Sequence, residues 1–342
     1  MTTTPAPSTP TERDVLRNAV AAAVLAPSSH NSQPWRFRIF RNALDVLTDR
    51  GRHLHVIDAE RRQQIQSCGC ALFNARIAVR AMGWFDDVRV ADPRSGDPDH
   101  LATLEIAVPH DPTPADQAML AAIPARRTNR RAFLPRPIAA AETDVMIALA
   151  ARLGVTATRL TPPTKQALGH LIERADEQQF ADPAFRAELA TWLRPFGSRQ
   201  RDGIPFVEKE YGSALPFTVM RALRSPTIGE RFGHIEDELV LGAPAVLVLG
   251  TPADDAAAWL ACGQALQAVL LHTTALGMSA SFLNQVLELP ALRGEVAGLV
   301  PEVGFPHMIL RLGYPAEPIH RAAPRRDVAD VLEELDDPGA PA

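Results

Sequence analysis

The chain contains 342 residues, of which 46% are hydrophobic and 22% are charged, a composition typical of a globular protein with a large core. The net charge of −5 argues against a general nucleic-acid-binding protein, because binding of that kind depends on a basic surface. Three cysteines, Cys68, Cys70 and Cys262, are too few for a disulfide framework and lack the spacing of a zinc site. These features favour a reducing cytoplasm.

Neither a signal peptide nor a membrane span is expected. Residues 1–10 are rich in threonine and proline and contain no apolar core of a signal peptide. We expect a disordered tail there and another at residues 336–342. The most apolar stretch, residues 239–271, is interrupted by prolines and by Asp254 and Asp255, which would be costly in lipid.

Residues 11–111 are predicted to form a first unit of helices and strands. A capping box of Thr11 and Asp14 opens one helix, and Asp58 caps a longer one. Alternating apolar residues predict the strands. In chain order the predicted elements are a helix at 11–25, strands at 35–40 and 44–48, a helix at 58–82 and a strand at 101–108.

Residues 112–335 are predicted to form a second, longer unit. Asp182 and Pro183 mark a helix start, because proline favours the first helical position. Residues 194–234 form an irregular insertion in which proline and glycine recur, and a run of this kind is usually functional or mobile. The other predicted elements are helices at 114–123, 140–153, 164–179 and 251–276 and strands at 245–249 and 308–312.

An internal repeat links the two units. The segments CGCAL (68–72) and CGQAL (262–266) lie on predicted helices that end at Gly83 and Gly277, and each helix precedes an alternating strand. A repeat of this length is too long for a solenoid. We therefore predict two copies of one α+β unit fused in a single chain.

Several reaction classes lack their motifs. The sequence contains no G-x-G-x-x-G after a predicted strand, no Walker A loop and no G-x-S-x-G elbow. Its ten histidines show no H-E-x-x-H or similar ligand spacing. The sequence therefore supports neither a dinucleotide fold nor a P-loop, and it indicates no catalytic residue and no metal ligand.

A polar turn follows the first predicted helix. Its hydroxyls, amides and prolines offer many hydrogen-bonding groups and little bulk, which suits close approach to a flat ligand with a polar edge. From composition alone, an ordinary capped turn is the simpler interpretation. The candidate binding residues in this turn are Pro27, Ser28, Ser29, His30, Asn31 and Gln33.

Arginines concentrate at two other places. One run begins with Arg126, Arg127 and Thr128, and a separate pair, Arg325 and Arg326, stands near the end of the chain. Such runs are either solvated surface or a clamp for a terminal monophosphate, because forked guanidinium groups match the geometry of phosphate.

These segments resemble the FMN-binding motifs of the nitroreductase superfamily. Residues 126–128 are similar to an Arg-Arg-Ser-like motif that grips the FMN phosphate and ribityl groups, with threonine in place of serine. Residues 27–31 are similar to a Pro-Ser-Ser-x-Asn-like segment that reaches the flavin of the partner subunit, and residues 325–326 are similar to a closing basic stretch. Leu283 and Asn284 fall where the family places the protein against the flavin ring.

The motifs are divided between the two units. The first unit carries only the 27–31 segment and the second carries only the arginine motif, whereas an obligate homodimer has both in every chain. The resemblance, which runs from about residue 13 to residue 332, therefore implies a nitroreductase-like α+β fold built as a fused pseudo-dimer. It would have one flavin site between its halves and would need no second chain. This arrangement resembles the Acg-type branch of the superfamily.

The resemblance implies an FMN-dependent oxidoreductase. Hydride would pass through flavin N5 to a small aromatic or quinone-like acceptor, with NAD(P)H as the reductant. The sequence leaves open the acceptor and the choice between NADH and NADPH.

The same resemblance implies an alternative function. Acg-type proteins carry a lid over the flavin that denies access to NAD(P)H, so such a protein would bind, store or sequester FMN without turnover. Residues 194–234 are the candidate lid, with Phe206, Tyr211 and Phe217 as its cover. A third class, a structural module without a cofactor, would give a colourless protein.

Overall fold

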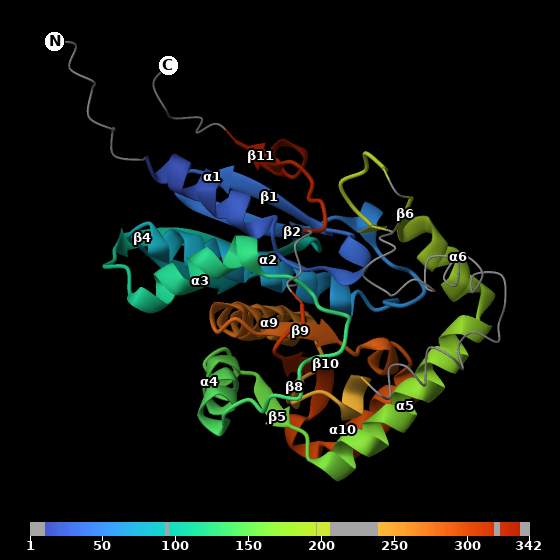
Figure 1. Ribbon diagram of the computed structural model, residues 1–342. Coiled ribbons are helices and arrows are strands. Elements are labelled where there is room, and N and C mark those ends of the chain that lie inside the picture. Colours follow the sequence, from blue (N-terminus) through green and yellow to red (C-terminus); the bar gives the residue numbers. More distant parts are fainter. Residues whose placement is uncertain (1–10, 93–95, 196, 206–238, 318–321, 336–342) are drawn as a thin grey trace.

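A computed structural model describes residues 11–92, 96–195, 197–205, 239–317 and 322–335. Two β-sheets lie on opposite sides of a central pair of long helices, α2 (Arg62–Ala81) and α9 (Ala256–Ala275) (Figure 1). α2 packs against the strands of the first sheet and α9 against those of the second. The molecule is therefore layered as sheet, helix, helix and sheet.

The first sheet has five strands in the order β11-β1-β2-β4-β3. β11 runs parallel to β1, and the other neighbours are antiparallel. Alternation along β1 buries Trp35, Phe37 and Ile39 in the same core as the apolar face of α1. The elements are α1 (Glu12–Ala23), β1 (Trp35–Phe40), β2 (Ala43–Thr48), β3 (Trp84–Val90), β4 (His100–Pro109) and β11 (Leu332–Glu334).

The second sheet has four antiparallel strands in the order β5-β8-β10-β9. Every residue of β8 is buried because both faces of this sheet are covered. Leu247 and Leu249 join the central core with α9, whereas Val246 and Val248 pack in a second cluster with α5 and α10. The strands are β5 (Thr156–Arg159), β8 (Ala245–Thr251), β9 (Ser279–Phe282) and β10 (Phe305–Gly313).

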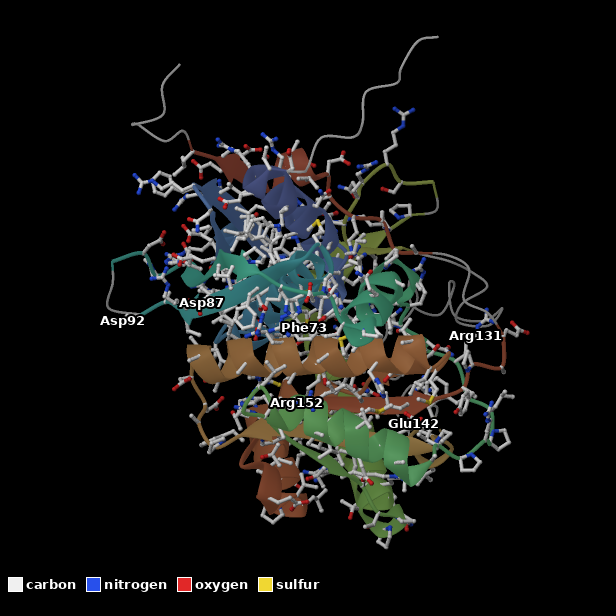
Figure 2. All side chains as sticks on the ribbon, turned by 90° about the vertical axis from the view of Figure 1, so that its left-hand side faces the viewer. Phe73, Asp87, Asp92, Arg131, Glu142 and Arg152 are labelled. Atoms are coloured by element: carbon white, nitrogen blue, oxygen red, sulfur yellow. The ribbon has the colours of Figure 1, made fainter. Side chains whose placement is uncertain are left out.

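The remaining helices surround these layers. α3 and α4 pack against α9, and α6 continues from α5. Figure 2 shows α9 between the first unit and α4, with Phe73 of α2 beside it. The elements are α3 (Pro114–Ala125), α4 (Ala140–Ala151), α5 (Pro162–Ala181), α6 (Pro183–Trp192), α10 (Pro290–Leu299) and the short strands β6 (Leu193–Arg194) and β7 (Ile204–Pro205).

The two repeated helices meet through their glycines. A Cβ atom on Gly69 or on Gly263 would meet a backbone carbonyl oxygen of the facing helix at a distance that real Cβ atoms do not reach. Beside this crossing, Gln267 Nε2 donates a hydrogen bond to Asn74 Oδ1 at 2.7 Å, and both residues are fully buried. The two copies of the repeat therefore face each other, and the predicted α+β architecture is confirmed.

The end of the chain returns to the first sheet. β11 pairs Leu332 with Phe37, and Glu334 forms ion pairs with Arg13 and Arg17 of α1 at 2.8 Å. The segment before β11 consequently passes the polar turn that follows α1. This path brings the arginine pair 325–326 to that turn.

Every helix and strand predicted from the sequence has a counterpart, whereas β3, β5, β6, β7, β9, α10 and β11 were not predicted. Asp58 is not the N-cap residue of α2, which is Arg61, because the helix begins at Arg62; its carboxylate still accepts hydrogen bonds from the backbone N–H groups of Gln63 and Gln64 in the first turn. In the described part of the chain, none of the helices has the length and apolar character needed to cross a membrane.

Part of the predicted lid falls outside the described residues. Residues 206–238 are among those not described, and they include Phe206, Tyr211 and Phe217. The predicted tails at 1–10 and 336–342 also lie outside.

Candidate functional site

One cavity of about 460 Å³ is lined by residues of both units. Its wall combines the turn after α1, the first turns of α2, the segment after α3 and the residues after β9. It therefore brings together the two motifs that are divided along the chain. The predicted site residues in this wall are Pro27, Ser28, Ser29, His30, Asn31, Arg126, Arg127, Thr128, Asn284 and Arg325.

The turn after α1 has an unusual backbone. His30, Asn31 and Gln33 all have a φ of 51°, in the left-handed region that non-glycine residues seldom adopt. Such residues cost on the order of 1–3 kcal/mol each and persist only where surrounding contacts hold them. Here Asn31 Nδ2 donates hydrogen bonds to the carbonyl oxygens of Gly203 at 3.0 Å and Pro324 at 3.1 Å. The turn is thus fixed by segments from the second unit.

A chain of hydrogen bonds runs from this turn across the cavity wall. Ser29 Oγ donates to Gln63 Oε1 at 2.5 Å, and Gln63 Nε2 donates to Glu288 Oε1 at 2.8 Å. Gln179 Nε2 donates to the other Glu288 oxygen at 2.6 Å. Burial raises the pKa of Glu288, and the two amide hydrogen bonds oppose that shift.

Three guanidinium groups in the wall form no ion pair with any residue that the structure describes. The Nε atoms of Arg126, Arg127 and Arg325 are buried and have no hydrogen-bond partner among the described residues. Burial lowers the pKa of Arg126 to about 10 and that of Arg325 to about 9, and the neighbouring arginines add to both shifts. Each group would be stabilised by a nearby negative charge.

The position of Arg325 depends on the strained turn. Its Nη1 donates to Asn31 Oδ1 at 2.9 Å and its Nη2 donates to the carbonyl oxygen of Leu25 at 3.5 Å. Because the Asn31 amide also bonds Gly203 and Pro324, its polar atoms are already engaged. Asn31 therefore acts on the cavity through Arg325.

The arginine segment is held by the second sheet. Thr128 forms a β-bridge with Ala280, whose carbonyl oxygen accepts a hydrogen bond from the Asn129 N–H at 2.9 Å. The buried Arg311 of β10 donates to the carbonyl oxygens of Arg131 at 2.9 Å and Asn129 at 3.2 Å. The segment is thereby placed opposite the turn of the first unit.

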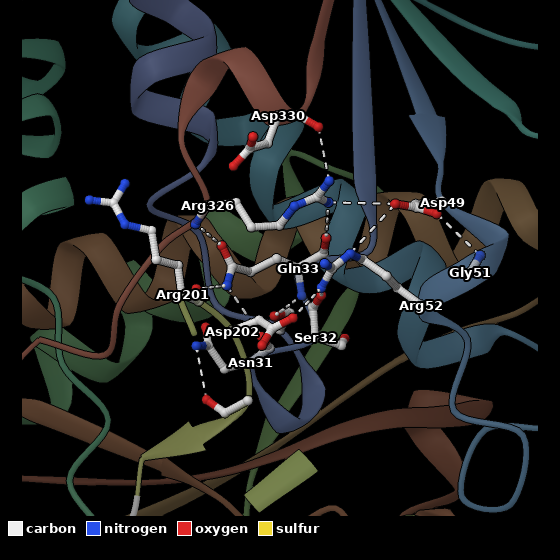
Figure 3. Close-up of polar contacts among 12 residues, drawn as sticks. Asn31, Ser32, Gln33, Asp49, Gly51, Arg52, Arg201, Asp202, Arg326 and Asp330 are labelled. Carbon is white, nitrogen blue, oxygen red and sulfur yellow. Dashed lines mark hydrogen bonds and ion pairs between the residues drawn. The ribbon is translucent and has the colours of Figure 1, made fainter. Parts of the chain in front are cut away.

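Three predicted site residues do not line the cavity. Leu283 is fully buried in the cluster beneath β8. Gln33 is also fully buried; its Nε2 donates to the carbonyl oxygen of Arg201 at 2.7 Å, and its Oε1 accepts from the Arg326 N–H at 2.8 Å (Figure 3). The Arg326 side chain faces Asp49, with an N–O distance of 3.5 Å. Gln33 and Arg326 therefore support the turn from the side that faces away from the cavity.

The cavity also contains residues that the sequence did not single out. Ile57 and Phe185 supply apolar wall, and Gln63, Gln179 and Glu288 supply the amide and carboxyl groups described above. They come from three separate parts of the chain, and none of them carries a motif. The one local sequence signal for these residues was the charged Glu288, which stands among apolar neighbours in residues 286–289.

The cavity fits the phosphate end of FMN. A phosphomonoester carries a charge of about −2 at neutral pH. Leaving buried cations unpaired is costly, so three such groups converging on one cavity indicate an anionic ligand. The unpartnered Nε atoms of Arg126, Arg127 and Arg325 supply the donors that such a group requires.

Comparison with known proteins gives sequence relatives over nearly the whole chain. The chain is 32% identical over 330 residues to a Mycobacterium tuberculosis protein provisionally named NAD(P)H nitroreductase Rv3131, covering 94% of this chain and 92% of that protein. It is 30% identical over 341 residues to the similarly named acg of the same organism, covering 95% and 97%. No family model matches the chain.

Solved structures of nitroreductases resemble the chain partially. The FMN-dependent nitroreductase NfnB of Mycobacterium smegmatis, in complex with NADPH, is 18% identical with a TM-score of 0.41, covering 63% of this chain and 96% of NfnB. A Bacteroides fragilis nitroreductase with bound FMN is 20% identical with a TM-score of 0.38, covering 66% and 97%. The family assignment rests on the sequence relatives: the chain belongs to the nitroreductase superfamily, in its Acg-type branch.

Proposed function

We propose that the cavity binds one FMN and that the protein is an NAD(P)H-dependent oxidoreductase acting on a small aromatic or quinone-like acceptor. The observation that carries this proposal is the convergence, on the turn formed by residues 27–31, of three guanidinium groups that form no ion pair with a described residue. The relatives named as NAD(P)H nitroreductases support the choice of reductant. A single chain supplies both motifs, so a monomer is sufficient.

Different residues of the chain would hold different parts of FMN. When bound, FMN supplies hydride transfer at its N5 atom. Arg126, Arg127 and Arg325 hold the phosphate, and Ser29 offers a hydroxyl oxygen to the polar edge of the ring. The side chain of Asn284 is held by the Ile309 N–H at 3.0 Å, so its backbone is the part available to a ligand. The apolar wall excludes water.

A second function is favoured by the segment before residue 206. Asp202 accepts hydrogen bonds from Arg52 at 2.8 Å and Arg194 at 2.9 Å, and Ile204 lines the cavity. A segment fastened in this way against the turn favours a closed flavoprotein that binds, stores or sequesters FMN without turnover.

Anaerobic mixing of the purified protein with NADPH distinguishes the two functions. A yellow protein that bleaches on mixing supports the oxidoreductase. A yellow protein that keeps its colour supports the closed flavoprotein. A colourless protein that does not take up added FMN would refute both, because each requires the flavin site.

A further inference from the structure

Glu288 is the one carboxylic acid among the described residues that line the cavity. Glu288 follows the 3₁₀ helix Gln285–Leu287, and its two carboxyl oxygens accept hydrogen bonds from Gln63 and Gln179, which belong to different units. No carboxylate–cation pair of Glu288 occurs among the described residues. The structure has therefore placed a carboxyl group in the wall of a cavity that the apolar side chains of Ile57 and Phe185 also line.

The surroundings of Glu288 favour its protonated form more than water does. Burial is the largest influence and raises its pKa, and the nearby Asp58 carboxylate acts in the same direction. The hydrogen bonds from Gln63 and Gln179 and the positive charge of Arg62 oppose the shift. The net result is a carboxyl group that keeps its proton to a higher pH than an exposed glutamate.

The hydrogen bonds of Glu288 leave room for that proton. Each carboxyl oxygen has two lone pairs, and one amide N–H group occupies one of them on each oxygen. A proton on either remaining lone pair breaks neither hydrogen bond. Gln63 and Gln179 thus orient the carboxyl group in both of its protonation states.

The other titratable groups of the wall cannot act as acids near neutral pH. Burial, aided by Arg130, lowers the pKa of His30 to about 4, so its ring carries no proton to give as an imidazolium. The Cys70 thiol is fully buried, burial raises its pKa, and its S–H donates to the carbonyl oxygen of Gly263. Arginine does not release a proton in this range.

We propose that Glu288 donates the proton that accompanies hydride transfer to an acceptor bound in this cavity. For a quinone, the acceptor gains the hydride derived from NAD(P)H and one proton from the Glu288 carboxyl group. The O–H bond of Glu288 breaks, an O–H bond of the hydroquinone forms, and solvent returns a proton to the carboxylate. NAD(P)H, one proton and a quinone thus become NAD(P)⁺ and a hydroquinone. This inference rests on the proposed oxidoreductase function.

The test is rapid mixing of the NADPH-reduced protein with menadione across a range of pH. In the wild-type protein the rate of reoxidation should fall as pH rises through the pKa of Glu288. Glu288→Gln should slow this step by about 10²-fold or more at low pH and remove the pH dependence, because general acid catalysis contributes on that scale. FMN content should stay unchanged.

Two further variants separate proton donation from a structural role. Glu295→Gln changes an exposed carboxylate paired with Arg174 at 2.8 Å, and it should leave the rate and the pH profile unchanged. Gln179→Leu removes one hydrogen bond to Glu288, which should raise the pKa of the carboxyl group and shift the pH profile to higher pH. A role in packing alone predicts no such shift.

A carboxyl titration provides a readout that does not depend on activity. In protein labelled with ¹³C at the glutamate carboxyl carbons, one resonance should titrate above the usual glutamate pKa of about 4.3 and should be absent from Glu288→Gln. If Glu288→Gln kept the wild-type pH dependence, or if no such resonance were found, this inference would be overturned and the proposed function would stand. A wild-type protein that NADPH does not reduce would overturn the proposed function, and the inference with it.

Discussion

At the scale of single residues, the proposed FMN site depends on three cations that form no ion pair within the described part of the chain. Arg52 shows the ordinary arrangement, since it pairs with Asp202 at 2.8 Å. Arg126, Arg127 and Arg325 differ because their buried Nε atoms have no partner among the described residues. A bound anion would supply an acceptor for these Nε–H groups.

Removing one of these cations should weaken FMN binding. Hydrogen bonds to charged groups contribute about 1.5–3 kcal/mol each, so Arg127→Ala should raise the dissociation constant of FMN about tenfold or more. The flavin content after purification and a fluorescence titration measure this. Arg174→Ala removes an arginine from an exposed ion pair on α5 and should bind FMN normally. Normal flavin occupancy in Arg127→Ala would count against the phosphate clamp.

The depressed pKa values predict that FMN binding depends on pH. Burial lowers the pKa of Arg325 to about 9 and that of Arg126 to about 10. The empty site is fully charged below these values and loses positive charge as pH rises through them, so FMN affinity should fall over that range. Titration with riboflavin, which lacks the phosphate, is the control and should show a smaller change. An FMN affinity that stays constant through this range would contradict the assignment of the clamp.

At the scale of elements, the crossing of α2 and α9 joins the two halves of the site. The first turns of α2 supply Gln63 and Ser67 to the cavity, and α9 supplies Leu266. The distance between the two helices is set by Gly69 and Gly263, where no side chain fits. The crossing therefore sets the spacing of two helices that both line the cavity.

Adding a methyl group at this crossing should destabilise the protein. Gly69→Ala places a Cβ atom against the backbone of α9, and overpacking of this kind costs about 1–3 kcal/mol of the free energy of unfolding. Gly294→Ala in α10 is the matched control, because its Cβ atom would meet nothing within 4 Å. It should stabilise the protein by about 0.5–1 kcal/mol. Chemical denaturation measures both, and equal stabilities of the two variants would refute the role of the crossing.

The elements that the sequence did not predict depend on distant contacts. β3 contains Asp86, a polar residue that is buried because Arg76 and Arg80 of α2 pair with it. β11 has no strand pattern of its own and forms by pairing with β1. α10 contains Gly294 and Gly298, which weaken a helical prediction. Local hydrophobic periodicity was sufficient to predict the elements whose apolar faces are continuous.

The site could be predicted in part for a similar reason. The segments 27–31 and 126–128 carry recognisable motifs, and the structure places both in one cavity. Gln63, Gln179 and Glu288 carry no motif, and only the packing of α2, α5 and the residues after β9 brings them together. The sequence therefore indicated the arginine-bearing side of the cavity but not the side that carries Glu288.

At the scale of the whole molecule, the two halves of the chain supply different groups to one site. The first half supplies the strained turn, and the second supplies the arginine segment and Arg325. The chain then returns to the first sheet through β11, which fixes Arg325 beside Asn31. Such an arrangement needs no second chain to complete the cavity.

Fluorescence titration of the flavin-free protein with FMN, together with the molar mass in solution from light scattering, tests this account most directly. We predict one FMN bound per chain, by a monomer. Two FMN molecules per chain, or binding that occurs only in a dimer, would contradict the claim that the two halves of one chain build one flavin site.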